Sequence, residues 1–405
     1  MTARAVLTLF HRYAGLALAG FLTLAGLTGS VIAFQDELDS WLNPQLYRTA
    51  SAGAPLAVDE LVEKIEHADA RLRVRGFSLR PEPGHALVVG VEPALDSRSG
   101  EPFALDFDEI FVDPVDARVL GRREWGVCCL QRERLIPFLY SLHYSLHLPG
   151  RTGVIIMGIV ALAWAVDCFV AFALTLPRGG PFWRRWRAAW RIERGASRYR
   201  LYHDTHQASG LWAWAILLVI AVSGLAMNLP DQVFRPALAL FSKLTPTPLE
   251  QGRAQLSTIG ERRIGFGAAI ASARDIAQKH GWPTQPSYVF YARTERAYGV
   301  GFVREGEDPE TGLGASWVYV NHHDSRLLAT ELMGSGSAGD VFAQAQFPLH
   351  SGRLLGLPGR ILISATGLIV AVLSVTGVYI WAVKRAARER ATAISPRSSR
   401  ALPPS

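Results

Sequence analysis

The sequence predicts a mainly α-helical membrane protein: a bundle of four transmembrane helices with two small α+β domains outside the membrane, built as a tandem parallel repeat. Three observations carry this prediction: four long apolar segments, an uneven distribution of charge, and matching motifs in the two halves of the chain. The 405 residues are 49% hydrophobic and only 19% charged. That composition argues against disorder and against an ordinary soluble enzyme.

Four apolar segments are long enough to cross a bilayer, which takes about 20 residues. They cover residues 13–34, 154–176, 209–229 and 361–383, and Asp167 is the one charged residue within them. The first segment is longer than the apolar part of a signal peptide, which spans about 7–15 residues. We therefore expect it to be retained as a membrane anchor.

Basic and acidic residues are unevenly distributed between the segments of the chain. Residues 1–12, 177–203 and 384–405 together contain sixteen Lys and Arg but two Glu, whereas the rest of the chain has 26 basic and 33 acidic residues. Short, positively charged segments stay in the cytoplasm. This predicts a bacterial inner-membrane protein with both termini and the 177–203 loop inside. The net charge of +7 is then a consequence of topology, and no nucleic-acid partner is expected.

The predicted organisation has eight segments. They are the cytoplasmic N-terminus with the first span (1–34), a periplasmic domain (35–142), the second span (143–176), a basic cytoplasmic loop (177–203), the third span (204–229), a second periplasmic domain (230–349), the fourth span (350–383) and a basic tail (384–405).

The two halves share motifs at matching places. His11 and His206 open the first and third spans, and each precedes a Gly-Leu pair that begins four residues later, at Gly15 and Gly210. Leu-Pro-Gly-Arg recurs at 148–151 and 357–360. Alternating apolar residues predict β-hairpins at 110–120 and 318–328, and apolar periodicity predicts helices at 58–70 and 266–280. Parallel repeats place equivalent residues at equivalent depths.

Six histidines lie near the ends of the spans. On the cytoplasmic side these are His11, His203 and His206, and on the periplasmic side His143, His147 and His350. Two imidazoles that face each other across a helical bundle can ligate a six-coordinate haem. Glycine four residues after a histidine lies on the same helix face and leaves room for the porphyrin. Gly15 and Gly210 meet this requirement, and Gly150 follows His143 by seven residues.

Arginines near the membrane surfaces fit the same hypothesis. Arg12, Arg151, Arg353 and Arg360 could pair with haem propionates. Topological anchoring for Arg12 and lipid headgroup contact for the others explain them equally well. Zinc or copper held by His203 with His206, or by His143 with His147, is the competing hypothesis. Few carboxylates and no Cys or Met cluster accompany these pairs, so haem is favoured.

Other residues have simpler expectations. Asp167 should face the bundle, because an unpaired carboxylate in the membrane is costly. A hydrogen bond to a neighbouring helix is its expected role, and orienting a ligand histidine or relaying a proton are the alternatives. In the second half of the chain, Thr376 occupies the position that corresponds to Asp167. Cys128 and Cys129 allow a vicinal disulfide. Trp183, Trp186 and Trp190 predict an amphipathic helix at the membrane surface. His322 and His323 are expected on a surface turn.

The sequence resembles the PepSY-associated transmembrane family, in particular members similar to inner-membrane ferric-siderophore reductases of the ferrioxamine-reductase type. The resemblance spans nearly the whole chain. It rests on the segments 10–16, 141–146, 164–169, 174–177, 183–190, 202–206, 210–212 and 347–353. It implies PepSY-like periplasmic domains and b-type haem, with two haems as the expectation. It places the ligands at His11, His143, His206 and His350, with His147 and His203 as alternates.

The resemblance implies an oxidoreductase that passes electrons from a cytoplasmic or quinol donor to periplasmic ferric siderophores. Reduction weakens the grip of hard oxygen ligands on iron, which releases it for uptake. A siderophore transporter and a non-catalytic PepSY regulator are the alternatives. Transport usually needs broken helices and a polar midplane site, and a regulator would not need histidines at both faces. Beyond the siderophore and the donor, membrane lipid is the expected partner.

Overall fold

The computed structural model describes residues 1–129, 131–193, 195–247 and 262–394. The described chain forms two compact units. The helical unit contains Met1–Ser30, His143–Asn228 and the chain from Ile363 onward, and the sheet unit contains Val31–Leu142 and Leu229–Leu362. Each unit is therefore assembled from both halves of the sequence.

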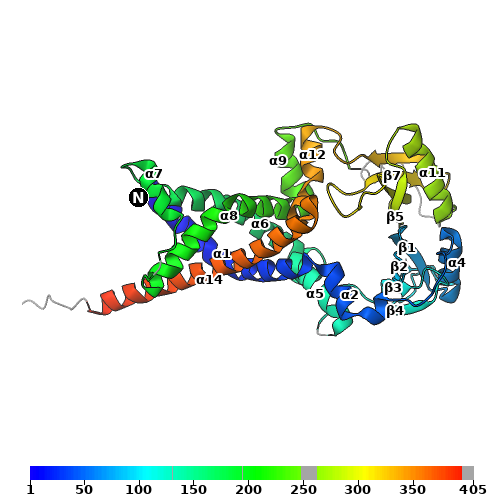
Figure 1. The fold of residues 1–405 in the computed structure, drawn as a ribbon, viewed down its shortest axis with the longest axis horizontal. Coiled ribbons are helices and arrows are strands. Elements are labelled where there is room, and N and C mark those ends of the chain that lie inside the picture. Colours follow the sequence, from blue (N-terminus) through cyan, green and yellow to red (C-terminus); the bar gives the residue numbers. More distant parts are fainter. Residues whose placement is uncertain (130, 194, 248–261, 395–405) are drawn as a thin grey trace, which may run out of the picture. The chain divides into compact units, whose positions relative to one another are not determined.

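Four long helices form the helical unit (Figure 1): α1 (Ala3–Ile32), α6 (Thr152–Thr175), α8 (Arg198–Asn228) and α14 (Gly356–Ile394). All four are long and apolar enough to cross a membrane, as the sequence predicted. Helices α1 and α8 begin before the apolar segments at 13–34 and 209–229, because polar flanking residues continue the helix. His11 and His206 consequently lie about two turns inside α1 and α8. Helix α14 begins at Gly356, so the predicted fourth span, residues 350–383, is not one helix, and His350 lies on α13 (Gln346–Ser351).

Small residues bring α1 and α14 into close contact. A Cβ added at Gly26 would lie 2.5 Å from the Gly367 carbonyl oxygen, so the two backbones touch there. One turn away, the Ser30 hydroxyl donates to the Ser364 carbonyl at 2.8 Å, and the Ser364 hydroxyl donates back to the Ser30 carbonyl at 3.0 Å. Close approach through small residues, with hydrogen bonds between helices, is typical of membrane helix packing.

The predicted second span, residues 143–176, is not one helix. The chain leaves α5 (Arg132–Ser145) and starts α6 only at Thr152. In the link between these two helices, Leu146 and His147 adopt positive φ angles of 55° and 53°. The following Pro149 disfavours a helical residue before it, which ends the helix at this point. His143 and His147 therefore do not share a helix face, and Gly150 does not share one with His143.

Helix α7 (Phe182–Ala189) lies in the Arg-rich loop, where the tryptophan spacing predicted it. Trp186 anchors it to the bundle by donating from Nε1 to the Thr175 hydroxyl at 3.3 Å. Trp183 on the same helix is 73% exposed. An anchored aromatic side and an exposed aromatic side are consistent with a helix at a membrane surface.

One antiparallel sheet of eight strands dominates the sheet unit. Its order is β4-β3-β2-β1-β5-β6-β7-β8. The strands are β1 (Leu72–Ser78), β2 (Leu87–Pro93), β3 (Glu109–Val112), β4 (Val119–Arg123), β5 (Gln285–Ala292), β6 (Ala297–Val303), β7 (Ser316–Asn321) and β8 (Leu327–Glu331). Both predicted hairpins form, as β3 with β4 and β7 with β8.

The helices of the sheet unit are short. Those that cover the sheet core are α4 (Val58–Ala68) and α11 (Phe266–Lys279), close to their predicted bounds. The others are α2 (Gln35–Leu42), α3 (Pro44–Tyr47), η1 (Pro230–Phe234), α9 (Arg235–Ala239), α12 (Ala338–Gln344), α13 (Gln346–Ser351) and η2 (Arg353–Leu355).

The two predicted α+β domains are joined rather than separate. Strands β1 and β5 pair antiparallel at the centre of the sheet, through Gly76 with Phe290 and Phe77 with Val289. A Cβ at Gly76 would lie 2.7 Å from the Phe290 Cβ, so glycine permits this close pairing. Helices α4 and α11 lie on the same side of the sheet (Figure 1) and share one buried apolar core with its strands.

The expected surface position of His322 is wrong. His322 is 6% exposed, and the Tyr291 hydroxyl lies 3.3 Å from its Nδ1. The segment before α11 covers it, since the backbone amides of Arg263 and Ile264 both donate to the His322 carbonyl at 3.1 Å. Burial lowers the pKa of His322. A turn that another segment crosses cannot be recognised from its own sequence.

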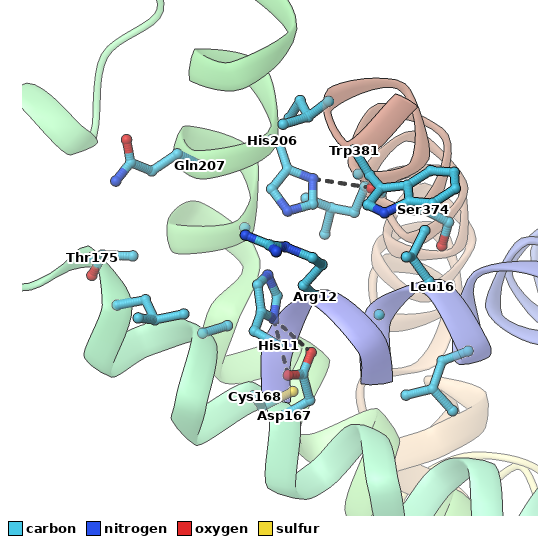
Figure 2. A pocket seen from close by; sticks show the side chains of 18 of the residues that line it. His11, Arg12, Leu16, Asp167, Cys168, Thr175, His206, Gln207, Ser374 and Trp381 are labelled. Carbon is cyan, nitrogen blue, oxygen red and sulfur yellow. Dashed lines mark hydrogen bonds and ion pairs between the residues drawn. The ribbon is translucent and has the colours of Figure 1, made fainter. Parts of the chain in front are cut away.

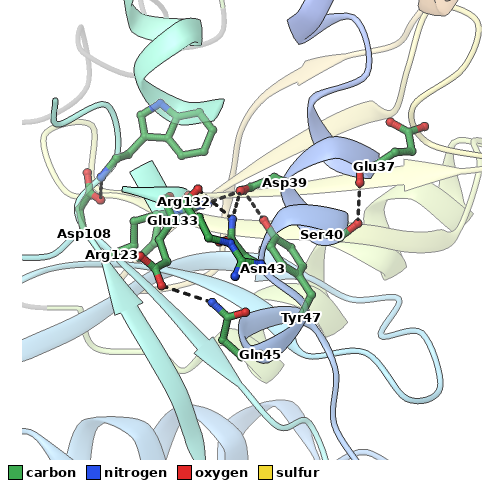
Figure 3. A network of polar contacts seen from close by, with 12 residues as sticks. Glu37, Asp39, Ser40, Asn43, Gln45, Tyr47, Asp108, Arg123, Arg132 and Glu133 are labelled. Carbon is green, nitrogen blue, oxygen red and sulfur yellow. Dashed lines mark hydrogen bonds and ion pairs between the residues drawn. The ribbon is translucent and has the colours of Figure 1, made fainter. Parts of the chain in front are cut away.

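A buried ionic network holds the first half of the sheet unit to its flanking helices (Figure 3). Arg123 on β4 donates to Asp39 on α2 at 2.7 Å and to Glu109 on β3 at 3.0 Å, and its side chain is 2% exposed. Asp39 also accepts from the Tyr47 hydroxyl at 2.7 Å and from the Asn43 amide at 2.8 Å. The network joins α2, α3 and the edge of the sheet. Just beyond β4, Cys128 and Cys129 form a vicinal disulfide.

Candidate functional site

A cavity of about 360 Å³ opens within the helical unit, lined by residues of α1, α6, α8 and α14. Its volume lies in the range of pockets that hold small molecules or cofactors. Figure 2 shows that His11 and Arg12 on α1, Asp167 on α6 and His206 on α8 project into the same space. Four helices that are far apart in sequence thus contribute to one site.

The imidazoles of His11 and His206 face each other across this cavity. Their ring centroids are 6.1 Å apart and their planes are tilted by 53°. An imidazole nitrogen binds a metal at about 2 Å, and that nitrogen lies about 1 Å from the centre of its ring. Two imidazoles on opposite sides of one metal therefore have centroids about 6 Å apart. The observed separation matches that arrangement.

Each imidazole is held through its Nδ1 atom. His11 Nδ1 lies 2.9 Å from both carboxylate oxygens of Asp167. His206 Nδ1 lies 3.0 Å from the Leu373 carbonyl oxygen and 3.1 Å from the Thr376 hydroxyl. A hydrogen bond at one ring nitrogen fixes the tautomer and leaves the other available to a metal. Both rings therefore have Nε2 as the nitrogen available for ligation.

The expectation that Asp167 bonds to a neighbouring helix is confirmed, and its partner is a candidate ligand. Asp167 is 7% exposed. Thr376, at the corresponding place in the second half, contacts the other candidate ligand, His206. The Leu373 carbonyl was missed, because a backbone acceptor has no sequence signal. Gly377 was missed as well. It lies against the ring of His206, since a Cβ there would be 3.2 Å from His206 Cε1.

Gly15 and Gly210 leave the space that their spacing predicted. A Cβ added at Gly15 would meet nothing within 4 Å, and one at Gly210 would meet a single atom, Leu373 Cδ2, at 3.6 Å. Both glycines line the cavity, as does the half-buried Arg12. Both imidazoles thus border a largely apolar cavity whose lining includes two cationic side chains, Arg12 and Lys384.

The structure distinguishes between the two histidines of α8. His203 also lines the cavity, but its side chain is 39% exposed and its Nδ1 lies 3.6 Å from Asp204. His206, one turn further into the helix, is the residue that faces His11. We therefore assign His206, rather than His203, as the partner of His11.

His143 has a similar local setting elsewhere in the helical unit. Its Nδ1 lies 3.0 Å from the Thr28 hydroxyl, and a Cβ at Gly29 would lie 3.0 Å from its Cε1. His147 lies in the link between α5 and α6, and His350 lies on α13 in the sheet unit. A second ligand pair formed by His143 and His350 stays a prediction.

The predicted arginines have different settings. Arg12 lines the cavity, and Arg151 is exposed at the start of α6. In the sheet unit Arg353 donates to Asp36 and Glu310, each at 3.1 Å, and Arg360 forms a bidentate pair with Glu37. These pairs balance the charges of Arg353 and Arg360 within the protein. Their suggested pairing with propionates stays a prediction.

The described residues offer little for a metal-ion cluster. Among them, no group of three or more His, Cys, Asp or Glu side chains is arranged to hold an ion. The zinc and copper hypothesis therefore gains no support from the described part of the chain. A pair of facing imidazoles, by contrast, has the donor geometry for a cofactor that brings its own equatorial ligands.

Four apolar helices of membrane length define a multi-pass membrane protein. A family model described as the PepSY-associated TM region matches residues 8–384. The chain therefore belongs to the PepSY-associated transmembrane family. No curated protein matches it significantly.

Proposed function

We propose that this protein is a haem-dependent reductase of a bacterial inner membrane that passes electrons to periplasmic ferric siderophores. The observation that carries the proposal is the pair of facing imidazoles, His11 and His206, 6.1 Å apart in a cavity between four membrane helices. When bound there, a b-type haem would carry one electron at a time from a quinol or cytoplasmic donor. One electron converts one ferric ion to the ferrous state.

The residues of the cavity fit such a cofactor. Asp167 and the Leu373 carbonyl hold the two Nδ1 atoms, so the Nε2 atoms of His11 and His206 would be the ones to hold the haem. Gly15 and Gly210 leave room for a flat macrocycle beside the ligands. Arg12 lines the same cavity and could pair with a propionate. Such a donor set would suit a haem held by two imidazoles.

The proposal includes a second haem, ligated by His143 and His350, so that electrons would cross the membrane in two steps. The position of His143 supports it, because this imidazole lies within the helical unit with its Nδ1 3.0 Å from the Thr28 hydroxyl, as His206 Nδ1 lies 3.1 Å from the Thr376 hydroxyl. The proposed topology has both termini and the α7 loop in the cytoplasm and the sheet unit, a fusion of PepSY-like repeats, in the periplasm. The arginines around α7 support this orientation.

Absorption spectroscopy tests the proposal. The full chain, expressed with haem supplied and purified in detergent, should show a Soret band that shifts on reduction with dithionite. Adding a ferric hydroxamate siderophore to the reduced protein, without oxygen, should restore the oxidised spectrum and form ferrous iron that a ferrous chelator traps. Absence of the Soret band would contradict the haem site. A reduced spectrum that the siderophore leaves unchanged would contradict the reductase activity alone.

Filling the cavity should remove its haem without unfolding the chain. Gly15→Leu places a side chain where a Cβ meets nothing within 4 Å, so we expect normal folding and loss of this haem. Gly20→Leu is the matched control, because Gly20 lies on the same helix, is exposed and also has open space around its Cβ. The haem-to-protein ratio and thermal unfolding report the two effects. Equal haem content in the two variants would place the haem elsewhere.

A further inference from the structure

The two facing imidazoles are held by acceptors of different charge. His11 Nδ1 contacts a carboxylate, at 2.9 Å from each oxygen of Asp167. His206 Nδ1 contacts neutral acceptors, the Leu373 carbonyl at 3.0 Å and the Thr376 hydroxyl at 3.1 Å. Asp167 and Thr376 hold the same place in the two halves of the sequence. Both candidate ligands are therefore imidazoles, but only the group that holds His11 carries a negative charge.

The carboxylate of Asp167 is hydrogen-bonded to His11. Asp167 is 7% exposed, and His11 is its one hydrogen-bond partner among the residues that the structure describes. A carboxylate that accepts from the Nδ1–H of a ligating imidazole makes the other nitrogen a stronger donor. Charge effects of this kind are large in an apolar, water-poor setting.

We propose that Asp167 is a positioning residue that fixes the tautomer of His11 and lowers the reduction potential of the haem bound between His11 and His206. A stronger nitrogen donor and a nearby negative charge both stabilise ferric over ferrous iron. A low potential favours electron transfer onward to a ferric chelate. This inference rests on the proposed function.

The test is a redox titration of the purified full chain, followed by its absorption spectrum. Asp167→Asn keeps a carbonyl oxygen to accept from Nδ1–H but removes the charge. Changes to residues that support metal ligands typically alter affinity about 10–100-fold. We expect this variant to retain haem and to lose about tenfold in preference for ferric iron, which is an upward shift of about 59 mV for one electron.

Thr376 supplies the matched variants. Thr376→Val leaves the Leu373 carbonyl on His206, so its shift should be smaller than that of Asp167→Asn. Thr376→Asp places a carboxylate on the opposite ligand and should lower the potential. In the double variant Asp167→Asn with Thr376→Asp, the charge moves from one ligand to the other, so the potential should return towards that of the wild type.

The outcomes separate the two ideas. Wild-type protein without haem overturns the proposed function and this inference together. Wild-type haem with an unshifted or lowered potential in Asp167→Asn overturns this inference alone. If Asp167→Asn loses its haem, Thr376→Asp decides: a lowered potential supports the inference, and an unchanged one overturns it.

Discussion

Replacing His11 or His206 with alanine is expected to remove the same haem, so each single variant keeps about half of the wild-type haem. The reason is geometric: the two rings face each other at 6.1 Å, and a bis-imidazole site needs both. The double variant should lose no more than either single variant. The haem-to-protein ratio, from the absorption spectrum of purified protein, measures the effect. Twice the loss in the double variant would contradict a shared iron.

Two further variants make this result specific. His203→Ala, three residues before His206 on the same helix, should retain the haem, because His203 is not the ring that faces His11. His350→Ala should remove the other half, which is the haem proposed between His143 and His350. Complete loss from any single substitution would indicate one shared site or collapse of the bundle.

Replacing Arg123 with alanine is expected to destabilise the sheet unit by about 3–5 kcal/mol, the usual cost of breaking a buried ion pair from one side. The variant leaves Asp39 and Glu109 buried without their cation. Unfolding of the full chain, followed by hydrogen exchange of the β3 and β4 amides, measures the loss. Arg122→Ala is the neighbouring control and should cost less than about 1 kcal/mol, because its bond to Asp69 involves an arginine that is 40% exposed.

The loss of unfolding free energy caused by Arg123→Ala should become smaller as the pH falls from 7 to 5. Burial raises the pKa of Glu109, even though Arg123 opposes that effect. Without Arg123 the pKa should rise further above its unfolded value of about 4.3. A carboxyl group whose pKa is raised on folding stabilises the fold at low pH and loses that contribution as the pH rises through the folded pKa. A loss of unfolding free energy that becomes larger on acidification would contradict this account.

Local patterns predicted the elements well. The helices at 58–70 and 266–280 form as α4 and α11, and the hairpins at 110–120 and 318–328 form as β3–β4 and β7–β8. Each depends on apolar periodicity within a few turns or residues. The link between α5 and α6 was the main local error. It lies between a polar helix and an apolar one, and only the Leu-Pro-Gly sequence marked it.

Pairing between distant segments was not predictable in the same way. Nothing in Gly76 or Phe290 distinguishes a strand at the centre of eight from an exposed edge, so the joining of the two halves emerged only with the fold. Likewise, Arg123 and Asp39 are 84 residues apart, and no local rule connects them.

For the site, the sequence by itself determined four membrane helices, six histidines near their ends, and glycines that leave room beside His11 and His206. Those features depend on spacing along one helix, which the period of 3.6 residues fixes. Only the tertiary structure decided that His206 rather than His203 faces His11, and that Asp167 and Leu373 hold the two rings. Those choices depend on how four helices pack and rotate against one another, and small residues such as Gly26 and Gly367 set that packing through contacts hundreds of residues apart.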